Sequence, residues 1–217
     1  MISFLSELKN QANALQKQQT DACQDVAAHT QSCEQACRML LAYLKDLATQ
    51  LNVIHPPAVG QYSLDGKTRF ADMVLKSFRS DARKKMLRDG EVFDSLGMGW
   101  ELLPADGVVA KGSITVNFPP ELERVTQRLS IGQIKHERKD IRHPETQKLQ
   151  AYVFEYDTHS RGSIMVTPDH DTGLMAFRIT NMGGFELFNI TFPATQVTHG
   201  LMDELAKKLL GQTSRFT

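Results

Sequence analysis

The residues best placed to do chemistry in this sequence are four polar side chains on three predicted strands. Glu155 and Asp157 alternate with aromatic residues in one strand, and Arg178 and Asn189 take the alternate positions in two later ones. If the aromatic residues face inward, alternation places these four together on the opposite sheet face. Such a face could bind a polar small molecule or exchange protons with it. The alternative is a solvated face in which Arg178 pairs with a carboxylate.

A second set of reactive side chains lies near the N-terminus, where His29, Cys33 and Cys37 repeat at intervals of four. On a helix, adjacent members of this set are neighbours and could share a metal ion. The outer pair are about 12 Å apart along the axis, so all three cannot reach one ion. Small or semipolar residues are also ordinary core residues at these positions. We therefore predict no metal and no cofactor, and keep these three as the weak candidates.

Other short motifs resemble metal-binding, nucleotide-binding or catalytic sequences but have simpler structural explanations. Residues 169–171, Asp-His-Asp, fall between two predicted strands, where the neighbouring Pro, Thr and Gly are typical of a tight turn. Gly97 and Gly99 form a lone GxG within a strand-like run, and residues 183–184 are a Gly-Gly pair in a hairpin turn. No serine or cysteine lies in a strand-turn-helix elbow. The sequence thus carries no catalytic signature and argues against an enzyme.

The balance of charge limits the classes of partner. There are 25 basic and 25 acidic residues, so no net field attracts the chain to nucleic acid or to an anionic membrane. The densest basic runs, residues 79–88 and 135–148, are interrupted by acids and contain no aromatic residues for base stacking. Nucleic-acid binding is therefore the weakest of the functional alternatives.

Composition also predicts the compartment. The first residues reach polar and acidic side chains before any apolar run long enough for a signal peptide, and no later stretch is long enough to cross a bilayer. The three cysteines form no paired framework, which fits a reducing environment. We expect a cytoplasmic protein with no membrane partner.

The element that would carry the His and Cys residues is a long N-terminal helix. Residues 3–51 contain neither Gly nor Pro and are rich in Ala, Gln, Leu and Lys. Apolar residues recur on a heptad pattern typical of a coiled coil. In the second half, Cys37, Met39, Leu41, Leu44 and Leu51 widen the apolar surface, so we expect this half to pack on the rest of the protein.

The first half of the helix carries only a narrow apolar stripe. A narrow stripe needs a partner, either a second chain or the helix's own second half if the chain folds back near Thr20 and Asp21. We favour self-association or a protein partner, and leave open whether the helix is straight. The predicted interface residues are those on the stripe: Leu5, Leu8, Ala12, Leu15, Ala22 and Val26.

The remaining chain predicts an antiparallel-sheet domain with packed helices, so the fold class is α+β. We expect the helix over residues 1–52, a Pro- and Gly-containing linker over 53–66 and the domain over 67–217. Strands are predicted at 91–103, 112–118, 148–158, 162–167, 174–180 and 185–192, with an edge strand or ribbon at 133–142. Residues 68–90 fit either a helix or strands.

Two features concern the arrangement of the domain. A strand, a Phe-Pro pair, a helix and a glycine recur at 114–132 and 188–211, which leaves open two similar halves, 67–132 and 133–217. The C-terminal helix at 196–210 needs an apolar sheet face to cover. We expect this face to consist of Tyr152, Phe154, Tyr156, Phe177, Ile179, Phe188, Ile190 and Phe192.

The leading functional hypothesis is a non-enzymatic assembly or interaction protein. The N-terminal helix would self-associate or bind a partner, and the α+β domain would bind a protein or small ligand. The alternative is an enzyme or small-molecule sensor that uses the face with Glu155, Asp157 and Arg178.

Overall fold

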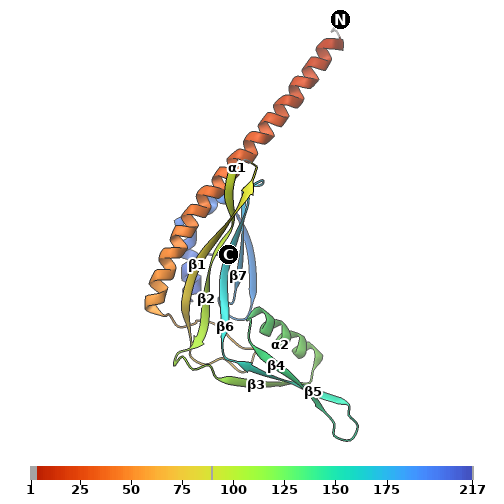
Figure 1. Ribbon diagram of the computed structural model, residues 1–217, viewed down its shortest axis with the longest axis vertical. Helices are drawn as coiled ribbons and strands as arrows, with labels where there is room; N and C mark the ends of the chain where they lie inside the picture. The colour runs from red at the N-terminus through yellow and green to blue at the C-terminus, as the bar shows by residue number, and fades with distance from the viewer. Residues whose placement is uncertain (1–3, 89, 217) are drawn as a thin grey trace.

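The fold combines one long helix with two antiparallel sheets and two shorter helices (Figure 1). This computed structural model describes residues 4–88 and 90–216, and before Gln24 it describes only the side chains of Lys9 and Asn13. A helix followed by an antiparallel-sheet domain with further helices confirms the predicted α+β class.

The larger sheet has five strands in the order β1-β2-β6-β7-β8, and every neighbouring pair is antiparallel. The bounds of these strands are Met73–Leu87 for β1, Gly90–Pro104 for β2, Ser160–Asp169 for β6, Leu174–Thr180 for β7 and Leu187–Pro193 for β8. The segment 68–90, which the sequence leaves undecided, thus supplies a strand. The predicted strands near 91, 162, 174 and 185 are confirmed.

Helix α1, Phe4–Ile54, lies along one face of this sheet with its C-terminal half (Figure 1). Its buried stripe consists of Cys33, Ala36, Cys37, Leu40, Leu44, Ala48 and Leu51. Apart from the adjacent Ala36 and Cys37, these residues are spaced three or four apart. They follow the 3.6-residue period of an α-helix, so the stripe drifts away from a strict heptad. The predicted packing of the second half on the body is confirmed.

At its C-terminal end, α1 is fixed to β1 by Asn52. The Asn52 side chain donates to the Phe78 carbonyl (2.9 Å) and accepts from the Phe78 N–H (2.8 Å). Phe78 lies in a β-bulge: Lys76 pairs with Glu101 and Arg79 with Gly99, so two residues of β1 lie opposite one residue of β2. Asn52 therefore satisfies the two backbone groups that the bulge removes from the ladder.

The smaller sheet has the order β3-β5-β4 and lies at the end of the molecule where α2 is found (Figure 1). Its strands are β3, Lys111–Val116, β4, His136–Arg142, and β5, Leu149–Asp157, and α2 spans Pro119–Ile131. The expected strands near 112 and 148 are confirmed. The charged β4 is an exposed edge strand, as its sequence predicts.

The expected apolar face under the C-terminal helix needs correction. Helix α3, His199–Leu209, buries Met202, Leu205 and Leu209, and Phe177 and Ile179 lie on the core side of the larger sheet. The three aromatic residues of β5 belong instead to the smaller sheet: Tyr152, Phe154 and Tyr156. Each sheet also combines strands from both sides of residue 132, so the repeated strand-helix units do not enclose separate sheets.

Replacing Asn52 with alanine tests the bulge. Asn52→Ala removes the hydrogen-bond partners of the Phe78 N–H and carbonyl. The Phe78 side chain is only 3% exposed. An unsatisfied buried polar group costs about 1–3 kcal/mol, and we expect a loss of that size in the free energy of unfolding by urea. Gln50→Ala, at an exposed position on the same helix end, is the control and should change stability little. Equal losses in both variants would contradict this role.

Candidate functional site

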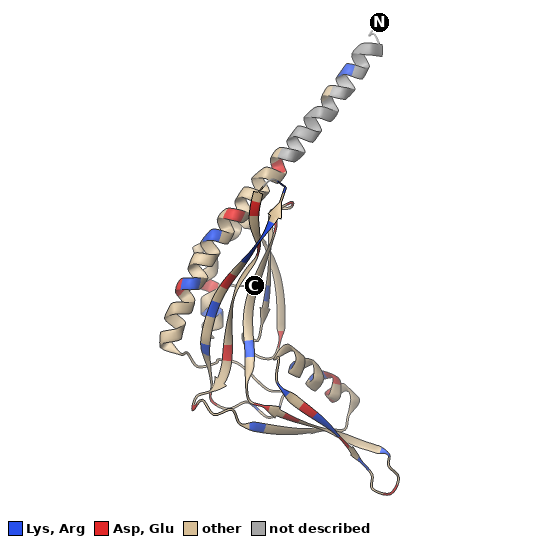
Figure 2. Ribbon diagram, viewed as in Figure 1, with Lys and Arg blue, Asp and Glu red and all other residues tan. Residues whose placement is uncertain are grey.

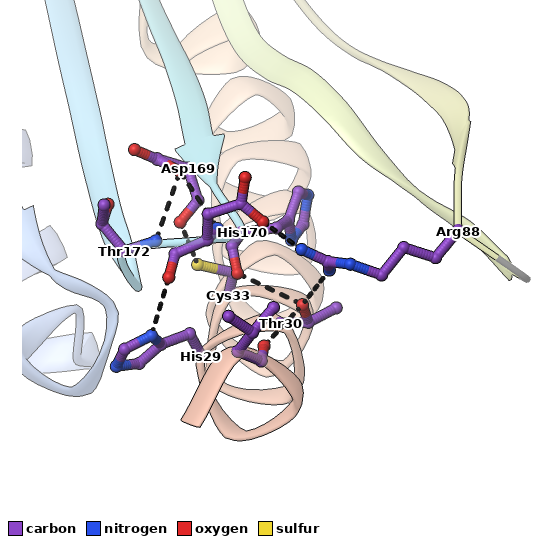
Figure 3. A network of polar contacts seen from close by, with 9 residues as sticks. His29, Thr30, Cys33, Arg88, Asp169, His170 and Thr172 are labelled. Atoms are coloured by element: carbon purple, nitrogen blue, oxygen red, sulfur yellow. Dashed lines mark hydrogen bonds and ion pairs between the residues drawn. The ribbon is translucent and has the colours of Figure 1, made fainter. Parts of the chain in front are cut away.

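Near its middle, helix α1 meets the body in a polar network at the end of the larger sheet (Figure 3). The turn between β6 and β7 lies against the helix: His29 Nδ1 is 2.9 Å from the Asp171 carbonyl, and the Thr30 hydroxyl donates to the His170 carbonyl (3.2 Å). Arg88 reaches over from the β1–β2 hairpin and contacts both Thr30 and the Asp171 carboxylate. Three separate segments thus meet here and fix the direction in which α1 leaves the body.

The turn that makes these contacts is itself preorganised. The Asp169 carboxylate accepts hydrogen bonds from the backbone N–H groups of Asp171 (3.0 Å) and Thr172 (3.3 Å). Together with a hydrogen bond from the Thr172 side chain, the largest contribution, these bonds hold the pKa of Asp169 below its usual value. His170 is buried and its Nε2 lies 2.8 Å from the Phe93 carbonyl. The prediction of a turn at 169–171 is confirmed.

The predicted helix interface lies mostly outside the described side chains. Of the six predicted residues, only the side chain of Val26 is described, and it is half-buried. The side chains outside the description are those of Leu5, Leu8, Ala12, Leu15 and Ala22. The helix is continuous from Phe4 to Ile54, so the chain does not fold back near Thr20 and Asp21. Gln24, Asp25, Ala27 and Ala28, which surround Val26, are exposed. From Gln24 on, Val26 and His29 are thus the first side chains that are partly buried.

The weak metal candidates have separate surroundings. Cys33 Sγ lies 3.5 Å from the Asp169 carbonyl, His29 contacts Asp171, and Cys37 is fully buried in the core. Over the described residues, no group of three or more His, Cys, Asp or Glu side chains is arranged to hold a metal ion.

The face of the larger sheet opposite α1 and α3 is open, and it carries polar side chains in rows across the strands. Arg178 and Asn189 are directly opposite each other on β7 and β8, so the structure brings these two candidates together. One row runs through Arg79, Gly99, Ser163 and Thr180, and the next runs through Asp81, Gly97, Met165 and Arg178. Because alternate residues share a face, these rows point away from the core.

Glu155 and Asp157 do not share this face, and that part of the prediction is wrong. Both lie on β5, in the smaller sheet. Only two residues separate β5 from β6, but the N–H groups of Asp157 and Thr158 donate to Lys135 (3.0 Å) and Ala110 (2.8 Å), so no hairpin forms. The Glu155 carboxylate instead pairs with Lys139 (2.6 Å), and this hydrogen bond lowers its pKa.

The open face also contains a hollow of about 340 Å³ that was not predicted from the sequence. Arg79 on β1 and Arg161 on β6 line it from either side of β2. Ser163 and Thr180 also line it, and Gly99, between Arg79 and Ser163 in the row, leaves space. A signal was present, because Gly97 and Gly99 alternate with buried residues in β2 and thus mark an open strip on the outer face. Arg79 could not be assigned to a sheet face from the sequence, because it lies in the segment 68–90, which fits either a helix or strands.

Charge does not single out one face of the molecule. Figure 2 shows basic and acidic residues mixed over the described part of α1 and over both sheets. In the described part of the chain, no helix combines the length and apolar character that a membrane span requires. Comparisons with protein-family models, with curated proteins and with solved structures found no match.

The two described cysteines should be chemically inert in the folded protein. Cys33 and Cys37 are both 0% exposed. Burial, with the nearby charges of Asp169 and Glu34, raises the pKa of the Cys33 thiol to about 11, and burial also raises the pKa of Cys37. Because the thiolate is the nucleophile, both should resist iodoacetamide at pH 8 and react after unfolding in urea, as peptide mapping by mass spectrometry would measure. Equal labelling of either residue in native and unfolded protein would contradict the packing of α1.

Proposed function

We propose that this protein is an assembly protein that self-associates through the N-terminal part of α1 and presents its α+β body as a binding domain. The observation that supports this proposal most is where the body begins to cover the helix. Among the side chains described from Gln24 on, none is buried before Cys33, where the buried stripe of α1 begins.

The lengths of the elements support the same proposal. With 51 residues, α1 is about 76 Å long at 1.5 Å per residue. The longest strands, β1 and β2, have 15 residues each and span about 50 Å. The helix is therefore longer than the sheet that it covers. Because α1 is one continuous helix, its N-terminal stripe cannot pack against the second half of the same helix.

The junction in Figure 3 gives the helix a fixed direction. His29, Thr30 and Arg88 hold α1 to the β6–β7 turn and to the β1–β2 hairpin. A helix held in this way presents the same stripe at the same angle in every copy, which suits a two-stranded coiled coil. Self-association of identical chains needs only this one self-complementary surface.

Charged substitutions on the predicted stripe test the proposal in the full-length protein. We expect the native chain to form an oligomer, most simply a dimer, measured as absolute mass by light scattering after size exclusion. Leu8→Glu combined with Leu15→Glu places two charges in the apolar seam. The double variant should raise the dissociation constant at least tenfold, equivalent to about 1.4 kcal/mol, and shift the mass toward that of one chain.

The matched control carries the same two charges on the helix but off the stripe. Asn13→Glu combined with Gln24→Glu uses exposed positions. This variant should keep the native mass, and thermal unfolding of the body should be the same in both variants. A native chain that is monomeric at all concentrations, or equal effects of the two double variants, would refute self-association through this stripe.

A further inference from the structure

The hollow on the open sheet face has the form of a small ligand site. Its volume of about 340 Å³ lies in the range of small-molecule pockets. Its floor is made by Gly99, which has no side chain, and by Ser163 and Thr180, whose hydroxyl groups are hydrogen-bonded at 2.9 Å. Arg79 and Ser163 lie on either side of Gly99 in one row, two strand spacings or about 10 Å apart. An extended arginine can cross this distance, so its guanidinium can reach the centre of the floor.

Two arginines line the hollow from strands on either side of β2, and little negative charge offsets them. Arg79, on β1, is exposed and has no carboxylate within 4.0 Å in the described part of the chain. Arg161, on β6, has its side chain 61% exposed, and its nearest carboxylate oxygen is that of Glu101, 3.9 Å away. The same Glu101 oxygen is also 3.9 Å from His159 Nε2, so Glu101 makes no close ion pair with Arg161. The hollow therefore has spare positive charge.

The floor of the hollow is held from behind by Trp100. Alternation along β2 places its side chain on the core side, where it is 2% exposed. There the indole lies over Gly162, where any side chain would overlap the ring, and its centre is 6.0 Å from that of Phe78. A floor supported in this way is formed before a ligand arrives, which lowers the cost of binding.

We propose that this hollow binds a phosphate group, either as the free anion or as the end of a small phosphorylated molecule. Arg79 and Arg161 hold it from the two sides, and the hydroxyl of the Ser163–Thr180 pair that accepts within the pair donates from the floor. Donors in three directions suit a tetrahedral oxyanion better than a planar carboxylate, and guanidinium groups bind phosphate oxygens in pairs. Glu101, at the rim, is placed to accept from a hydroxyl group of a phosphorylated molecule. The site lies on the body and does not depend on self-association of α1.

Calorimetric titration of the full-length protein with inorganic phosphate, at ionic strength held constant with chloride, tests the site. We expect saturable binding. Trp100 is the chain's only tryptophan and backs the floor, so its fluorescence should change with the same saturation curve. Arg79→Gln and Arg161→Gln should each raise the dissociation constant at least tenfold.

Arg83→Gln is the matched control, because Arg83 lies on the same face of the same strand and pairs with Ser95, outside the hollow. It should bind phosphate as the native protein does. Tighter binding of glycerol phosphate than of inorganic phosphate would support the site and identify a phosphorylated molecule as its ligand, while equal binding would support it as a site for the free anion. Absence of saturable binding by calorimetry would overturn the proposal. Equal weakening in all three variants, each with the native thermal stability, would also overturn it.

Discussion

The packing of α1 against one face of the five-stranded sheet is the contact on which the rest of the structure depends. Leu40, Leu44 and Leu51 are each at most 2% exposed, so removing the helix would expose both its own stripe and the core side of the sheet. A sheet of this kind needs one face covered and can leave the other in water. Because α1 and α3 cover the core face, the polar rows with Arg79, Ser163 and Arg178 remain open.

The same contact is fixed by polar side chains at both of its ends, and each end supports one of the proposed functions. At one end, His29 and Thr30 meet the β6–β7 turn and set the direction of the helix. At the other end, Asn52 supports the bulge in β1. The bulge inserts one residue between Lys76 and Arg79, which brings both onto the open face, and Arg79 thereby borders the hollow. A helix whose only role was to cover the sheet would need neither the contacts of His29 and Thr30 nor those of Asn52.

The sequence predicted the fold class and most strands because their apolar residues alternate with a period of two. The segment 68–90 was ambiguous for a specific reason: in β1 the buried residues are Met73, Leu75 and Phe78, so the bulge changes the spacing from two to three. A spacing of three is typical of a helix, and the mixture fits both patterns. Arg79, at the end of the bulge, could not be assigned to a face until the strand itself was known.

The pairing of strands was less accessible to the sequence than their existence. Alternation with inward-facing aromatic residues led to the expectation that Glu155 and Arg178 share one face, and the short connection between β5 and β6 is typical of a hairpin. This hairpin is prevented by hydrogen bonds to Lys135 and Ala110, which lie about 20 and 50 residues away along the chain. No local sequence pattern predicts these two partners. Local alternation thus identifies which residues point away from the core, but only long-range backbone pairing decides which of them meet. The hollow between Arg79 and Arg161 arises in this way, since β2 separates two strands that are distant in the sequence and contributes glycine between them.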